Sequence, residues 1–190
     1  MLIIVRHGRT ASNAAGVFLG HADPPLDPTG ETQADAVAAV LEGAGRVITS
    51  PLVRARQTAQ RIADRSDVDV EVDDRFIELD YGQWDQRPLV DVSAAEWEEW
   101  HNDLTFAPPG GESLEAVGRR VRSGLEDLAA AASHADVVVV THVSPLKSAV
   151  AWSLGAGDEI VWRMFVSPAA ICRIDVSRGR PSLHSFGERA

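Results

Sequence analysis

The sequence predicts an α/β fold: a three-layer α/β/α sandwich in which helices flank a mostly parallel central sheet. Short apolar runs of strand length alternate along the chain with longer segments in which apolar residues recur every three or four positions. This alternation is typical of strand–helix–strand units, whose helices cover both faces of a parallel sheet. The run Val137 to Val140 is apolar throughout, as expected for a central strand that is covered on both faces.

Six segments are expected to form strands. The clear ones are the apolar runs Leu2 to Val5, Val47 to Thr49, Val137 to Thr141 and Ile171 to Val176. Weaker patterns indicate two more, at Val68 to Val72 and Ser182 to Ser185. Helices are expected between most of them, because parallel neighbours need long crossover connections.

The first long helix has clear start and stop signals. Asp27 is a suitable N-cap, and Pro28 fits the first helical position, where its missing N–H is not needed. Gly43 and Gly45 are expected to end this helix.

Three more helices follow strands or loops. Ser50-Pro51 is a similar start signal directly after the strand at 47–49. Apolar residues spaced three and four apart predict a helix from about Ser113 to Ala132, and another begins after His142.

Composition limits the classes of protein to consider. The 190 residues are 45% hydrophobic and 24% charged, which is ordinary for one globular domain spanning residues 1–190. The formal net charge of −10 argues against nucleic acid as a partner.

Location and assembly are inferred from equally simple features. The first apolar run, Met1 to Val5, is too short for a signal peptide or a membrane span, so no membrane partner is expected. The single cysteine, Cys172, lies in an apolar run and is expected to be a buried core thiol, which favours a cytoplasmic location. The sequence leaves the oligomeric state open, with a homodimer as a guess.

Three predicted strands end in residues suited to phosphate chemistry. The first runs into Arg6-His7-Gly8, the second into Ser50-Pro51-Leu52-Val53-Arg54, and the third into Thr141-His142. Because the carboxyl ends of parallel strands meet at one edge of a sheet, these groups are expected to converge there.

These segments also carry a family resemblance. Arg6-His7-Gly8-Arg9-Thr10 with Asn13 resembles the RHGxTxxN signature of the histidine phosphatase (phosphoglycerate mutase-like) superfamily. The resemblance continues in order through nearly the whole chain, at residues 20–34, 50–59, Glu78 with Gly82, and 109–113. It implies a phosphomonoester hydrolase that forms a phosphohistidine, with no metal and no cofactor.

The expected catalytic residues are His7, Glu78, Arg6, Arg54 and His142. A neutral imidazole is a good nucleophile, and cationic Arg6 and Arg54 should lower the pKa of His7 while binding the equatorial phosphoryl oxygens. By resemblance, a nearby backbone carbonyl fixes the His7 tautomer. Burial beside a phosphate dianion is expected to favour the protonated form of Glu78. Glu78 can then protonate the leaving oxygen and later accept a proton from water.

Further residues are expected to bind the substrate beside Arg6, Arg54 and His142. Asn13 and the backbone amide of Val143 should contact phosphate, and the remaining candidates are Thr10, Leu19, Gly20 and His21. Gly110 to Ser113 is interpreted mainly as a turn followed by a helix N-cap. The aromatic segment around Trp84, Trp97 and Trp100 is either a lid over the substrate or half-buried packing.

The chain departs from the family pattern in two places. The usual THGG is Thr141-His142-Val143-Ser144 here, and the usual WEG is Trp84-Asp85-Gln86. Hydrolysis of a small phosphorylated metabolite is the preferred function. A phosphoglycerate mutase-type phosphoryl transferase and a non-catalytic module that binds phosphoesters or phosphoproteins are the alternatives.

Overall fold

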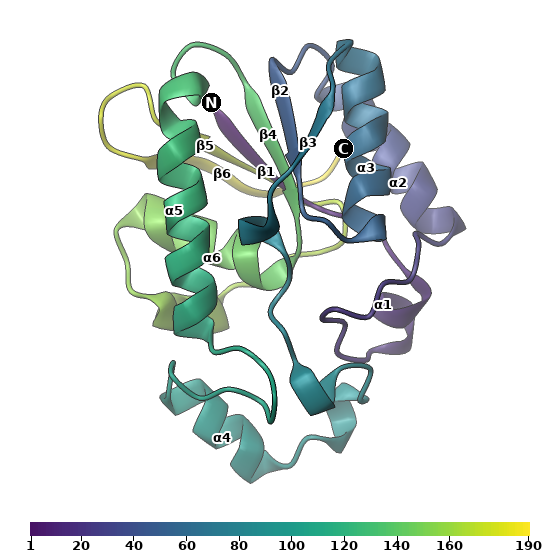
Figure 1. Ribbon diagram of the computed structural model, residues 1–190, viewed down its shortest axis with the longest axis vertical. Helices are drawn as coiled ribbons and strands as arrows, with labels where there is room; N and C mark the ends of the chain where they lie inside the picture. The colour runs from purple at the N-terminus through teal and green to yellow at the C-terminus, as the bar shows by residue number, and fades with distance from the viewer.

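Six strands form one sheet in the order β3-β2-β4-β1-β5-β6 in the computed structural model, which describes residues 1–190 (Figure 1). The strand bounds are β1 Leu2–Arg6, β2 Arg46–Thr49, β3 Val70–Val72, β4 Val137–Thr141, β5 Ile171–Asp175 and β6 Ser182–Glu188. β1, β2, β3 and β4 pair in parallel, whereas β5 and β6 run antiparallel at one side. The predicted mostly parallel sheet is confirmed.

Helices cover both faces of this sheet. α2 (Pro28–Val40) and α3 (Val53–Ser66) pack on one face, and α5 (Leu114–Ala132) and α6 (Val143–Leu154) on the other. Figure 1 shows the two pairs on opposite sides of the strands. The shorter helices are α1 (Ala11–Ala15) and α4 (Ala94–Asn102), and 3-10 turns occupy Asp74–Phe76, Gly82–Trp84, Leu89–Asp91 and Asp158–Arg163.

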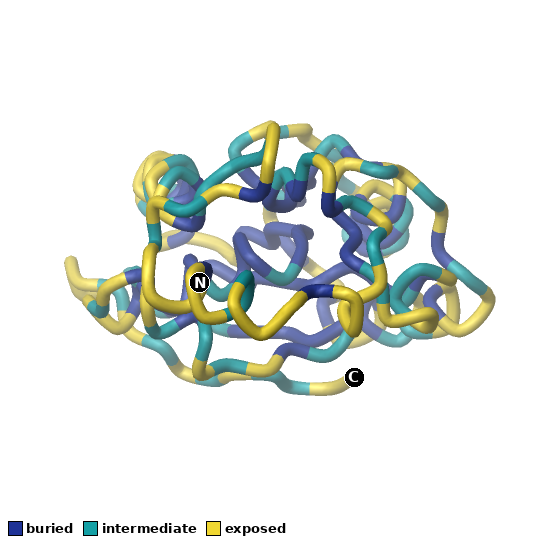
Figure 2. Tube along the Cα trace, turned by 90° about the horizontal axis from the view of Figure 1, so that it is seen from below, coloured by how far each residue is buried: buried dark blue, intermediate teal, exposed yellow.

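Alternating strand residues build two separate cores. Leu2 and Ile4 of β1 pack with α5 and α6, whereas Ile3 and Val5 pack with α2 and α3. This alternation is the expected consequence of the two-residue period of a strand. Cys172 is fully buried, as predicted. Seen from below, Figure 2 shows buried segments at the centre and exposed ones around the periphery.

The predicted helix caps are largely confirmed, with one correction. Asp27 accepts the Gly30 N–H at 2.8 Å, and Ser113 caps α5. The helix after β2 begins at Val53, later than the Ser50-Pro51 signal predicts. Ser50 is buried, and its hydroxyl accepts the Leu52 N–H at 3.3 Å, ahead of the helix, and also lies 2.7 Å from His142 Nε2.

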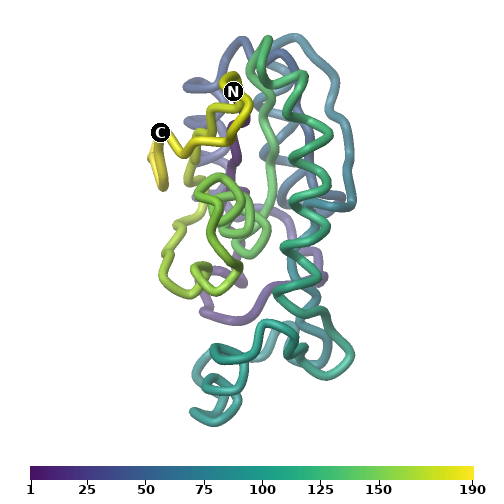
Figure 3. Tube along the Cα trace, turned by 90° about the vertical axis from the view of Figure 1, so that its left-hand side faces the viewer, coloured from purple at the N-terminus to yellow at the C-terminus, as the bar shows by residue number.

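The middle of the chain extends beyond the carboxyl ends of the parallel strands. Figures 1 and 3 show α4 at the lower end of the molecule, apart from the four long helices. None of the helices has both the length and the apolar character that crossing a membrane requires.

Candidate active site

The strand register brings the predicted histidines together. Arg6 lies opposite Thr141 in the parallel β1–β4 pair, so the next residue of each strand, His7 and His142, leave the sheet side by side. Their ring centroids are 5.0 Å apart. The predicted convergence of strand ends therefore occurs.

His7 is held in one tautomer. Its Nδ1 lies 2.6 Å from the carbonyl oxygen of Gly8, and because a carbonyl only accepts, Nδ1 carries the proton of the neutral ring. Nε2 then carries the lone pair, which accepts a hydrogen bond from Arg54 Nε at 3.3 Å. The backbone carbonyl implied by the family resemblance is present.

The surroundings of His7 keep it neutral. Burial lowers the pKa of His7 well below its usual value, and the positive charges of Arg54 and Arg6 lower it further. Burial also lowers the pKa of Arg6, to about 10. Arg6 donates from Nη1 to the carbonyl oxygen of Val166 at 2.7 Å, while its buried Nε has no partner.

Arg54 is fully buried and fixed by a loop. Its guanidinium donates to the carbonyl oxygens of Ala22 at 2.8 Å and Gly20 at 2.7 Å, with Leu19 at 3.5 Å. Asp85 in turn accepts the N–H groups of Gly20 at 2.8 Å and Ala22 at 2.7 Å. Asp85, which follows Trp84 where the family has WEG, therefore supports the loop that positions Arg54.

Of the three loop residues predicted to bind substrate, only one lines the cavity. Leu19 lines the cavity described below, whereas Gly20 and His21 do not. His21 Nε2 is 3.0 Å from the carbonyl oxygen of Glu78, and its Nδ1 is 3.7 Å from Asp80. In this structure, Gly20 and His21 contact other parts of the site, and a role in binding substrate stays a prediction.

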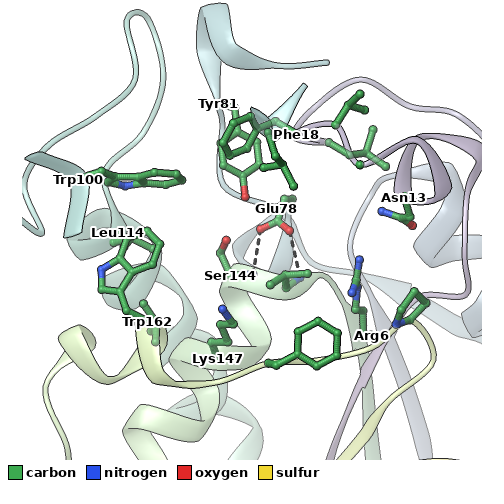
Figure 4. A pocket seen from close by; sticks show the side chains of 18 of the residues that line it. Arg6, Asn13, Phe18, Glu78, Tyr81, Trp100, Leu114, Ser144, Lys147 and Trp162 are labelled. Carbon is green, nitrogen blue, oxygen red and sulfur yellow. Dashed lines mark hydrogen bonds between the residues drawn. The ribbon is translucent and has the colours of Figure 1, made fainter. Parts of the chain in front are cut away.

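Glu78 is buried at the N-terminus of α6. Its carboxylate accepts three backbone N–H groups, from Leu79 at 2.8 Å, Val143 at 3.0 Å and Ser144 at 3.1 Å. Figure 4 shows the carboxylate facing the cavity between Arg6 and Trp100. The Val143 amide, predicted to contact phosphate, is occupied by Glu78 in this structure.

The turn at 110–113 is linked to the backbone of Glu78 through Arg120. Arg120 of α5 donates to the Glu78 carbonyl oxygen at 3.2 Å and pairs with Glu112 at 2.9 Å. The interpretation as turn and N-cap is confirmed. Glu112 also connects this turn to the loop that carries Glu78.

His142 is fully buried next to Ser50. Its Nε2 lies 2.7 Å from the Ser50 hydroxyl, and its Nδ1 has no partner in the protein. Burial and then the charge of Arg54 lower the pKa of His142 well below its usual value. His142 is therefore neutral beside His7.

Thr10 and Asn13 form a reciprocal cap at the start of α1. The Thr10 hydroxyl accepts the Asn13 N–H at 3.2 Å, and the Asn13 side chain accepts the Thr10 N–H at 3.1 Å. Asn13 also lines the cavity, but Thr10 does not. Gly8 packs so closely against α2 that a Cβ atom at this position would lie 2.3 Å from the Gly30 carbonyl oxygen.

A cavity of about 450 Å³ opens beside these groups. Arg6, His7 and Glu78 line one part of it, and aromatic residues line much of the rest. The aromatic middle segment is packed rather than free, because Trp84 and Trp100 are 5% and 3% exposed. Trp97 stacks on Trp100, and both line the cavity.

Several residues that line the cavity were not predicted from sequence, among them Phe18, Lys147, Trp162 and Phe165. Lys147 follows Val143 by four positions and so lies on the same side of α6, a spacing that could have identified it. The other three carry no comparable signal.

The structure contains no group of three or more His, Cys, Asp or Glu side chains placed to hold a metal ion. Two positive groups, Arg6 and Lys147, line the cavity, and Arg54 is buried behind His7 with its guanidinium bonded to the loop. Because the chain carries a net charge of −10, this local concentration of positive charge is a distinct feature of the site.

Comparisons with known proteins identify the family of the chain. A family model described as the histidine phosphatase superfamily (branch 1) matches residues 2–189. The chain is 34% identical over 176 residues to the bifunctional protein Rv2228c of Mycobacterium tuberculosis, covering 90% of this chain and 48% of that protein. It thus spans about half the length of this relative.

Two further relatives match over nearly their full lengths. The adenosylcobalamin/alpha-ribazole phosphatase of Salmonella typhimurium is 31% identical over 195 residues, covering 100% of this chain and 96% of that enzyme. The solved structure of the mycobacterial glucosyl-3-phosphoglycerate phosphatase Rv2419c with VO3 has a TM-score of 0.89 at 26% identity, covering 98% of each chain. The chain belongs to the histidine phosphatase superfamily.

Proposed function

We propose that the chain hydrolyses phosphomonoesters through a phosphohistidine on His7, without a metal ion. The observation that carries this proposal is the His7 ring, whose Nδ1 proton is held by Gly8 and whose Nε2 lone pair is directed toward Arg54. Binding alone needs no nucleophile with a fixed tautomer. The named phosphatases among the relatives support phosphoester hydrolysis.

In the first step, His7 Nε2 forms a bond to phosphorus as the bond from phosphorus to the ester oxygen breaks. Glu78, as general acid, delivers a proton to that oxygen, and the alcohol leaves. Arg6 and Arg54 stabilise negative charge on the equatorial oxygens, and neutral His142 adds a donor or acceptor.

In the second step, water attacks the phosphohistidine. Glu78, now ionised, accepts a proton from the water as the new oxygen–phosphorus bond forms and the bond to Nε2 breaks. Inorganic phosphate leaves, Glu78 is protonated again, and His7 returns to its neutral form. One carboxyl group therefore serves both steps.

The substrate is proposed to be a small phosphorylated metabolite. The relatives are named for alpha-ribazole phosphate and glucosyl-3-phosphoglycerate chemistry, both of which involve small molecules. A cavity of about 450 Å³ suits a ligand of that size.

The proposal is tested by phosphate release from p-nitrophenyl phosphate in EDTA, comparing the wild type with His7→Ala. The exposed His134 provides the matched control, His134→Ala. Turnover that survives EDTA, persists in His134→Ala and disappears in a folded His7→Ala protein is expected. Normal turnover in His7→Ala would show that His7 is not the nucleophile. Loss of turnover in EDTA would show that the activity needs a metal ion.

The same protein distinguishes the alternatives. A mutase-type transferase would move phosphate between hydroxyls of a phosphoglycerate faster than it releases inorganic phosphate. A non-catalytic module would bind phosphate esters and release none.

A further inference from the structure

The cavity beside His7 is mainly apolar. Twelve of its 20 lining residues are hydrophobic. Six of them are aromatic residues brought from separate parts of the chain: Phe18, Tyr81, Trp97, Trp100, Trp162 and Phe165. Figure 4 shows Trp100, Leu114 and Trp162 on the side opposite Arg6 and Asn13. We call this apolar part the aromatic chamber.

Charged groups are confined to the phosphate end of the cavity. Arg6, Glu78 and Lys147 are the only charged residues that line it. Lys147 is close enough to Glu78 and Arg6 for their charges to act on its pKa, which burial lowers. Its ammonium makes no ion pair in the protein, so it can add to the positive charge that receives a phosphate. The aromatic chamber itself contains no charge to pair with a polar substrate.

The rim of the cavity exposes apolar side chains to water. Phe165 is 81% exposed and Leu89 is 40% exposed, and both line the cavity. Exposed apolar surface beside a concave site is typical of ligand-binding regions. Covering this surface with an apolar ligand group is favourable, whereas covering it with a polyhydroxylated group also takes water from the hydroxyls.

We propose that the alcohol part of the substrate is a bulky aromatic group that occupies the aromatic chamber, with its phosphate at Arg6 and His7. This inference rests on the proposed function for the position of the phosphate. A flat ring can stack on the indole and phenyl faces, which favour offset or edge-to-face contacts. The indole N–H groups of Trp100 and Trp162 have no partner in the protein and can donate to a heteroatom of such a ring, whereas the charges of a phosphorylated amino acid would find no counter-charge in the chamber.

Calorimetric titration with phosphonates, which cannot be hydrolysed, tests this inference without turnover. The three probes are 2-(1-naphthyl)ethylphosphonate, ethylphosphonate and 2,3-dihydroxypropylphosphonate, titrated into the full chain. The naphthyl compound is expected to bind on the order of 10- to 100-fold more tightly than the other two, because only its ring fills the chamber. Equal dissociation constants, or a preference for the dihydroxypropyl compound, would overturn the inference.

Two substitutions locate the effect. Phe165→Ala changes an exposed side chain, so the fold should be retained, and it is expected to weaken naphthyl binding by roughly 3- to 10-fold while leaving ethylphosphonate unchanged. Phe186→Ala is the matched control, because Phe186 is 38% exposed on β6 and does not line the cavity. Naphthyl binding that is insensitive to Phe165→Ala, or equally sensitive to Phe186→Ala, would place the ring elsewhere.

The two proposals fail in different ways. If phosphomonoesters are hydrolysed through His7 but the three phosphonates bind equally, the catalytic proposal holds and the proposed preference for an aromatic group is wrong. If the naphthyl compound binds selectively but no ester is hydrolysed, the preference stands and the catalytic proposal is wrong.

Discussion

Replacing Glu78 by Gln tests the proposed acid and base with a minimal change of shape. The carboxylate accepts N–H groups from Leu79, Val143 and Ser144. A Gln amide has one oxygen, which can keep the bonds from Leu79 and Ser144 because both go to the same atom, Oε1. Its NH₂ group would then face the Val143 N–H. Because both groups are donors, the Val143 N–H would lose its acceptor.

The structural cost follows from that one conflict. A buried donor left without an acceptor destabilises a protein by about 1–3 kcal/mol, so the free energy of unfolding of Glu78→Gln is expected to fall by that amount in urea titrations. Losing a general acid is expected to lower kcat for an alkyl phosphate by about 10²- to 10⁴-fold. For p-nitrophenyl phosphate, the first step should slow far less, because the leaving group needs no proton.

The comparison between the two esters decides the role of Glu78. The first step is read from the burst of alcohol release, with the exposed Glu126→Gln as the matched control. If Glu78→Gln slows both esters equally in this step, Glu78 is not the acid and its effect is structural.

Three further predictions concern the surroundings of the site. Asp85→Ala removes two hydrogen bonds to the loop that positions Arg54, so kcat/KM for p-nitrophenyl phosphate should fall roughly 10- to 100-fold; unchanged kcat/KM would contradict this positioning role. Gln86 has a φ of 66°, so Gln86→Gly should raise the free energy of unfolding by about 1 kcal/mol in urea, and a decrease would contradict the strain argument. Burial lowers the pKa of His142 below 6.5, so below that pH the unfolded chain binds a proton that the folded one does not. The free energy of unfolding should therefore fall on acidification below pH 6.5, by up to about 1.4 kcal/mol per pH unit from this residue, and His142→Asn should show a shallower fall; identical slopes would contradict this.

The sheet and the convergence of His7, His142 and Arg54 could be predicted from sequence because both depend on local patterns. Apolar runs define the strands, and parallel pairing necessarily places their carboxyl ends at one edge. His7 and His142 meet for that reason, although 134 residues separate them. Arg54 follows from the same rule at the end of β2.

Other features depend on tertiary contacts that no local pattern reveals. The predicted start of α3 was too early, and the contact of the Ser50 hydroxyl with His142 joins segments that are distant in the sequence. The roles of Asp85 and Gly20 in supporting Arg54 likewise depend on how two loops pack. The aromatic chamber combines Phe18 with Trp162, and nothing in the sequence relates those positions before the chain folds.

The central claim, a phosphohistidine on His7, is tested most directly by trapping the intermediate. Wild type and Glu78→Gln would be mixed with p-nitrophenyl phosphate, quenched in alkali, where phosphohistidine survives, and digested for mass spectrometry. Phosphate is expected on His7 in both proteins, with more in Glu78→Gln because its second step is slowed, and none in His7→Ala. Turnover without a phosphorylated His7, or with phosphate on another residue, would contradict it.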